Sequence, residues 1–135
     1  MRVRGLQHVS SPFADGGQAM VRAFYGELLG LRELPTPSSG VPMAKPWESL
    51  GLVWFAAGDG LELHFFRGET DPAAARHFCL DVEDLEETRR RLLDAGHEPY
   101  DDTPIPNRPR FFCRDPAGNL VEFTRIEGPY TRSGL

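Results

Sequence analysis

The sequence runs through one order of features twice, and this duplication constrains its fold more than any other property. Each copy opens with a short strand-like segment that carries a histidine, His8 in QHVSSP and His77 in RHFCLD. Each copy closes with another strand-like segment that carries a glutamate, Glu62 in GLELHFF and Glu122 in GNLVEFT. A repeated order of this kind predicts two similar modules within one chain.

The length of the chain allows one domain built from these two modules. With 135 residues it can bury a core of ordinary size, but not two independent cores. We predict a single domain, residues 1–135, with module one at about residues 1–68 and module two at about residues 74–128. Module one is longer mainly because of the stretch LPTPSSGVPMAKP, whose proline and serine content is typical of a surface loop.

Between its histidine and its glutamate, each copy has the pattern of an amphipathic helix. Apolar residues at helical spacing mark the first helix: Met20, Phe24 and Leu28, with Val21 and Tyr25 beside them. In the second copy, Asp84 with Glu87 three residues later resembles a capping box. Gly30 and Gly96 are each well placed to end a helix.

The remaining apolar and aromatic runs predict strands. They are Leu50–Ala57, Leu61–Arg67, Arg110–Arg114 and Leu120–Ile126. The segment DPAGN between the last two is typical of a tight hairpin connection. Each module therefore has the order βαβββ, which places the chain in the α+β class.

Strand alternation predicts which way the histidines and glutamates face. Successive side chains of a strand point to opposite sides of the sheet. The residues flanking Glu62 and Glu122 are apolar and are expected to pack under the helix, so both glutamates face away from it. The same alternation places His8 and His77 on the face away from the helices.

If the two sheets curve together, these four side chains converge, and a metal ion then becomes the favoured interpretation. Burying unpaired carboxylates in one cavity would cost on the order of several kcal/mol of folding free energy each. A divalent cation removes that cost, and the predicted ligands are His8, Glu62, His77 and Glu122. A single strand histidine or glutamate more often faces solvent, so the duplicated placement is what favours a metal. His64, on the same face as Glu62, is the alternative fourth ligand.

Composition excludes several classes of partner. The net charge of −5 gives no electrostatic attraction for nucleic acid. The sequence has neither a signal peptide nor an apolar run of membrane-spanning length, so we expect a cytoplasmic protein that does not bind membranes. Cys79 and Cys113 lack CxxC spacing and are interpreted as buried residues with reduced thiols rather than as nucleophiles.

At these residues the chain resembles the vicinal oxygen chelate superfamily, which includes glyoxalase I, bleomycin-resistance proteins, fosfomycin-resistance enzymes and extradiol dioxygenases. The most specific stretches are FYGELLGL and DPAGNLVEF. The resemblance implies two βαβββ modules that form a glyoxalase-like pair of curved, mixed-sheet half-barrels. It also implies one divalent ion (Ni, Co, Zn, Mn or Fe) on His8, His77, Glu122 and, as in bacterial glyoxalase I, Glu62. Related proteins often pair modules across two chains, so we expect a homodimer.

The chain departs from bacterial glyoxalase I at two substrate-binding positions. Pro12 stands where that enzyme has an arginine, and Phe66 stands where it has an asparagine. Because both residues hold glutathione in that enzyme, glutathione hemithioacetal is not the expected substrate. Arg108 and Arg110, in the segment TPIPNRPRFF, are candidate contacts for an anionic substrate, and Phe66 is a further candidate substrate contact.

Three functions are compatible with these residues. In a metal-dependent lyase or isomerase acting on a small oxygenated molecule, the resemblance gives Glu122 the role of catalytic base. In a dioxygenase, His8, His77 and Glu122 would form a two-histidine, one-carboxylate Fe(II) site. In a drug-resistance-type binding protein, aromatic residues would hold a ligand without turnover, and the candidates are Trp47, Trp54, Phe66 and Phe111. A fourth ligand, Glu62 or His64, fills a position that dioxygen needs and so favours the lyase or isomerase.

Overall fold

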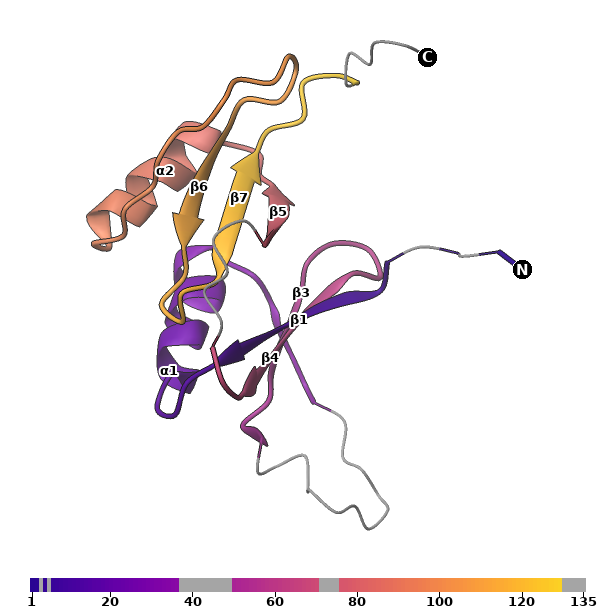
Figure 1. The fold of residues 1–135 in the computed structure, drawn as a ribbon, viewed down its shortest axis with the longest axis vertical. Helices are drawn as coiled ribbons and strands as arrows, with labels where there is room; N and C mark the ends of the chain where they lie inside the picture. The colour runs from indigo at the N-terminus through magenta and orange to yellow at the C-terminus, as the bar shows by residue number, and fades with distance from the viewer. Residues whose placement is uncertain (3, 5, 37–49, 71–75, 130–135) are drawn as a thin grey trace. The chain divides into compact units, whose positions relative to one another are not determined.

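The computed structural model describes residues 1–2, 4, 6–36, 50–70 and 76–129 (Figure 1). The chain divides into two compact units, Met1–Asp71 and Pro72–Leu135, and each is described by itself. Both units combine a helical segment with a mixed sheet, which confirms the α+β class. None of the helices in the described residues is long and apolar enough to cross a membrane.

The first unit has the predicted order βαβββ. Its elements are β1 (His8–Phe13), α1 (Gln18–Val21), which continues as the π-helix η1 (Arg22–Leu28), β2 (Glu33–Leu34), β3 (Val53–Ala56) and β4 (Glu62–Arg67). The sheet order is β1-β4-β3-β2. Strand β1 runs parallel to β4, whereas β3 runs antiparallel to both β4 and β2. The central position of β4 places Glu62 and His64 between two neighbouring strands.

The core of the first unit lies between the helical segment and one face of the sheet. It contains Phe13, Val21, Phe24, Tyr25, Val53, Phe55, Leu63 and Phe65, all buried. The ring of Tyr25 contacts both Phe55 and Phe65, so the helical segment covers their face. The predicted apolar stripe was wrong at Met20, whose side chain is 51% exposed. The buried side of the helix passes instead through Val21.

The second unit repeats this plan with a shorter sheet. Its elements are β5 (His77–Asp81), α2 (Leu85–Asp94), β6 (Arg110–Arg114) and β7 (Leu120–Thr124). The sheet order is β5-β7-β6, with β5 parallel and β6 antiparallel to β7. The order βαβββ also requires a strand directly after α2. At that place the structure has only an isolated bridge, in which Tyr100 and Phe112 exchange backbone hydrogen bonds of 2.8 and 2.9 Å.

Local signals in the sequence set several of these boundaries. The Asp84 side chain caps α2 by accepting a hydrogen bond of 3.0 Å from the Glu87 N–H, as predicted. Gly96 follows the end of α2 with a φ of +87°, a conformation that glycine adopts without strain. In the hairpin before β7, Asp115 Oδ1 accepts from the N–H groups of Ala117 and Asn119 at 2.9 and 2.8 Å. These bonds stabilise the tight turn that the DPAGN segment forms.

Candidate functional site

The sheet of the first unit carries polar residues on its face away from the helical segment. His8 lies opposite Glu62 in the β1–β4 register, and Trp54 of β3 lies opposite His64 of β4. Their alternating neighbours Leu63 and Phe65 belong to the buried core, so the polar residues occupy the other face. The structure thus places His8, Glu62 and His64 on one face, as strand alternation predicts.

Within this group, His64 is held between two other rings. Its ring centroid lies 3.7 Å from that of Trp54 and 4.1 Å from that of His8, and both contacts are stacked. Its Nε2 atom lies 2.8 Å from Glu62 Oε1, and its side chain is only 11% exposed. The stack and the hydrogen bond together hold the Glu62 carboxylate in place, since His64 has little freedom to rotate.

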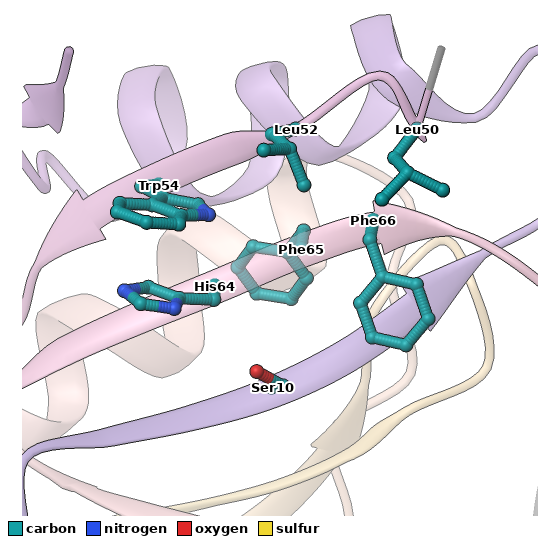
Figure 2. A pocket seen from close by; sticks show the side chains of 7 residues that line it. All are labelled: Ser10, Leu50, Leu52, Trp54, His64, Phe65 and Phe66. Atoms are coloured by element: carbon teal, nitrogen blue, oxygen red, sulfur yellow. The ribbon is translucent and has the colours of Figure 1, made fainter. Parts of the chain in front are cut away.

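A cavity of about 200 Å³ adjoins the stacked rings (Figure 2). Its lining consists of Ser10, Leu50, Leu52, Trp54, His64, Phe65 and Phe66. In Figure 2 the parallel rings of Trp54 and His64 lie to one side, the ring of Phe66 lies to the other, and Ser10 lies on β1. Of the predicted substrate contacts, Phe66 therefore does line a cavity.

The second unit brings His77, Arg110 and Glu122 together. His77 Nε2 lies 3.0 Å from Glu122 Oε2, and Arg110 Nη1 lies 3.1 Å from Glu122 Oε1. Arg110 Nη2 also donates to the Thr103 carbonyl at 2.9 Å, while the guanidinium carbon lies 5.1 Å from the centroid of the Phe112 ring. Arg110 and Glu122 are both largely buried, with side chains 13% and 14% exposed. One oxygen of Glu122 thus faces an arginine and the other faces a histidine.

The two units differ by two residues in the register that places their histidines. His8 lies directly opposite Glu62, whereas Cys79 lies opposite Glu122 and His77 lies opposite Leu120. Because side chains alternate with a period of two, this shift leaves His77 on the same face as Glu122. The His77 side chain still reaches the carboxylate, as the 3.0 Å distance shows.

Cys113 is buried as predicted, but the prediction of buried filler was wrong for Cys79, which is exposed. Desolvation of its thiol raises the pKa of Cys79 to about 12, and the negative charges of Glu122 and Asp81 add to this shift. Burial likewise raises the pKa of Cys113 to about 11. A nucleophilic or metal-binding cysteine requires a thiolate, so the interpretation of both residues as non-nucleophilic agrees with their surroundings.

Two pairs of residues, one in each unit, carry donor atoms of the kind that divalent metal ions bind. Neighbouring ligand atoms of an octahedral ion, each at about 2.1 Å from it, lie about 3.0 Å from each other. His77 Nε2 and Glu122 Oε2 have that separation, and His64 Nε2 and Glu62 Oε1 come close to it at 2.8 Å. The described residues include no group of three or more His, Cys, Asp or Glu residues arranged to hold a metal. The four-ligand set draws on both units and stays a prediction.

Other predicted site residues lie elsewhere. Arg108 donates to the backbone carbonyls of Asn107, at 3.0 Å, and of Gly128. Phe111 was wrongly assigned to an aromatic cavity, because it is fully buried in the core of the second unit and stacks on Phe123. Trp47 lies outside the described residues.

Sequence reasoning missed other residues of the sites. Ser10, Leu50 and Leu52 line the cavity of the first unit, and Phe112 packs beside His77. Strand alternation was the available signal for Ser10, which is two residues from His8, and for Phe112, which neighbours the buried Phe111.

Comparison with known proteins places these features in one family. Residues 5–123 match the model of the Glyoxalase/Bleomycin resistance protein/Dioxygenase superfamily. A solved structure of a glyoxalase family protein from Bacillus anthracis is 31% identical, with a TM-score of 0.80, and the match covers 93% of this chain and 98% of that one. No protein among the curated sequences matches the chain.

Two further solved structures share the fold at lower identity. TnmS3, an antibiotic binding protein from Streptomyces sp. CB03234, is 21% identical with a TM-score of 0.69, over 93% of this chain and 98% of that one. FosX, a fosfomycin resistance protein from Listeria monocytogenes, is 18% identical with a TM-score of 0.68, over 91% of each chain.

Proposed function

Since the chain belongs to the Glyoxalase/Bleomycin resistance protein/Dioxygenase superfamily, we propose that it is a metal-dependent lyase or isomerase acting on a small oxygenated molecule. The observation that carries the proposal is the approach of His77 Nε2 to Glu122 Oε2 at 3.0 Å, on a face that strand alternation turns away from the core. A histidine and a carboxylate at this separation suit two neighbouring positions around one ion. The proposed ligands are His8, Glu62, His77 and Glu122.

The proposed chemistry divides between the ion and the residues of the chain. A bound divalent ion lowers the free energy of the negative charge that develops on a substrate oxygen when a neighbouring proton leaves. Glu122 is the proposed base that accepts this proton. To accept it, Glu122 would release the ion, and Arg110 Nη1, 3.1 Å from Oε1, would keep the carboxylate in position.

The fourth ligand is proposed to be Glu62 rather than His64. Two carboxylates neutralise a divalent ion, whereas one carboxylate leaves uncompensated charge. The hydrogen bond from His64 to Glu62 supports this choice, because carboxylate ligands of metals are themselves usually held by a neighbouring donor. The alternative, with His64 as ligand and Glu62 as the free base, uses the same pair of residues.

The substrate is proposed not to be glutathione hemithioacetal. Pro12 and Phe66 lie directly opposite each other on neighbouring strands, β1 and β4. At these two positions the related glutathione-dependent enzyme carries polar residues, so here an apolar pair stands where polar contacts would be needed. This adjacency supports the choice of a less polar substrate.

A binding protein without catalysis is the second candidate. The cavity of about 200 Å³ beside Trp54 and Phe66 favours it, because such a cavity can hold a ligand whether or not a reaction follows. The similarity of fold to an antibiotic binding protein, TnmS3, is in keeping with this candidate. An Fe(II) dioxygenase is the third candidate and requires that neither Glu62 nor His64 binds the ion.

Metal binding tests the proposal directly. Protein purified without chelator is analysed for metal content, then stripped and titrated with Ni²⁺, Zn²⁺, Mn²⁺ and Fe²⁺ while its melting temperature is followed. We expect about one ion per chain and a raised melting temperature, since ligand binding stabilises the folded state. Glu122→Gln should abolish the increase, whereas the control Glu86→Gln, on the exposed surface of α2, should keep it. Failure of every metal would leave the binding protein as the better account.

A further inference from the structure

The cavity of the first unit has the size of one small ring. Its volume is about 200 Å³, and four of its lining residues are Leu50, Leu52, Trp54 and Phe66. A cavity of about 150 Å³ lined by Leu, Ile and Phe is large enough to bind benzene. In Figure 2 the rings of Trp54 and Phe66 lie to either side among the lining residues, so a ring in the cavity is flanked by aromatic side chains.

The polar groups of the cavity favour an uncharged occupant. Among the lining residues that the structure describes there is no Lys, Arg, Asp or Glu. Ser10 lies opposite His64 across β1 and β4, so the polar side-chain groups of the lining are one hydroxyl, one imidazole and the indole N–H of Trp54. The Nε2 atom of His64 already contacts Glu62 at 2.8 Å. An anionic group entering here would lose water without gaining a counter-ion.

The surroundings of the cavity link it to the proposed reaction site. Its wall residue His64 is hydrogen-bonded to Glu62, the proposed metal ligand. On the other side, Phe66 lies opposite Pro12, which extends the apolar surface along β1. A molecule in the cavity therefore has an apolar end, next to Phe66, and a polar end, next to Ser10 and to His64, which contacts Glu62.

We infer that this cavity binds one uncharged aromatic ring of the substrate, with the oxygen atoms of the substrate extending from the ring towards Glu62. The position of the ring follows from the cavity alone. The role of the oxygen atoms rests on the proposed function, because it requires a metal at Glu62. The substrate class is accordingly a small aryl compound with an oxygen-bearing substituent and no anionic group on the ring.

The first experiment measures ring binding without any metal. The full-length protein, in excess chelator, is titrated with 4-fluorobenzyl alcohol and followed by ¹⁹F NMR and calorimetry. We expect saturable binding with a Kd on the order of 1 mM or tighter, as is reasonable for a ligand of this size. The charged analogue 4-fluorobenzoate should bind about 10-fold more weakly or worse, and 2-fluoroethanol, which lacks the ring, should not bind.

Two matched substitutions locate the binding. Leu52→Trp should fill the cavity and weaken the binding of 4-fluorobenzyl alcohol by about 10-fold or more. Leu93→Trp makes the same change at a leucine that is 55% exposed on α2 and should leave binding unchanged. Leu52→Phe, a smaller change, serves if Leu52→Trp lowers the melting temperature strongly, and it should weaken binding in the same direction.

The outcomes separate this inference from the proposed function. Equal binding of the alcohol and the benzoate, no binding of the alcohol, or equal effects at Leu52 and Leu93 would each overturn the inference. A different result would separate the two proposals. If the alcohol binds in chelator but the affinity for a catechol does not increase when Ni²⁺ or Mn²⁺ is added, the cavity assignment stands. That result would count against a metal at Glu62.

Discussion

Arg110 Nη1 lies 3.1 Å from Glu122 Oε1, and the two side chains form an ion pair that is largely shielded from solvent. The Nε atom of Arg110 is buried without a hydrogen-bond partner among the described residues. The guanidinium of Arg110 contacts Glu122 and donates to the Thr103 carbonyl, so these groups, rather than an anionic substrate, occupy its terminal nitrogens. We therefore interpret Arg110 as a residue that positions Glu122.

Replacing Arg110 should destabilise the metal-free protein more than the metal-bound protein. Arg110→Gln leaves the Glu122 charge without its cation, which should cost about 1–3 kcal/mol of unfolding free energy. A bound divalent ion offsets that loss by neutralising Glu122, so the difference should shrink when metal is present. Urea denaturation with chelator and with metal measures both values.

The exposed ion pair between Arg125 and Glu127 provides the control for that experiment. Arg125→Gln should change the unfolding free energy little in either condition, because solvent screens the pair. Equal destabilisation of Arg110→Gln with and without metal would contradict a metal at Glu122.

Metal affinity should depend more on Glu62 than on His64. Glu62→Gln should weaken binding by about 10²-fold or more, whereas His64→Gln removes only the group that orients the carboxylate and should cost much less, nearer 10-fold. Calorimetric titration with Ni²⁺ or Mn²⁺ compares the two variants. Loss of metal by the His64 variant alone would reverse the assignment.

The chain should not turn over the glutathione hemithioacetal of methylglyoxal efficiently. Two lost polar contacts, at Pro12 and Phe66, should cost on the order of 2–6 kcal/mol of transition-state binding, which corresponds to a rate lower by about 10²-fold or more. The ultraviolet assay for thioester formation, run with metal-loaded protein, checks this expectation. Turnover at the level of a glyoxalase would prove it wrong.

Alkylation of Cys113 should be slow and should rise with pH. Burial raises the pKa of this thiol to about 11, so at pH 8 its thiolate fraction is about 10²-fold below that of an ordinary cysteine. The rate with iodoacetamide, followed residue by residue by mass spectrometry, should increase about tenfold per pH unit up to about pH 11. A rate at pH 8 equal to that of the urea-unfolded chain would refute the assignment.

The chain is predicted to form a homodimer. Strand β1 ends the order of the first sheet and β5 ends the order of the second, and such end strands are commonly covered by pairing. Light scattering at micromolar concentration should give twice the mass of the 15.1 kDa chain. A monomer under these conditions would favour pairing of the two modules within one chain.

Several elements could be predicted because their signals are local. The cap at Asp84 and the glycine after α2 need only a few neighbouring residues, and both were confirmed. The face of Glu62 and Glu122 followed from a period of two along a strand. The stripe on the first helix was wrong at Met20, because packing of Tyr25 on Phe55 and Phe65 selects the side that is buried.

The sequence by itself determined the duplicated modules, the class of fold and the sheet face on which each histidine and glutamate lies. These properties follow from the spacing of residues along one segment of chain. Only the tertiary structure decided that His8 lies opposite Glu62 while Cys79, not His77, lies opposite Glu122. It also decided that Arg110 contacts Glu122 and that Trp54 stacks on His64. Register and contacts between strands depend on how distant segments pack, and a shift of two residues leaves every local pattern unchanged.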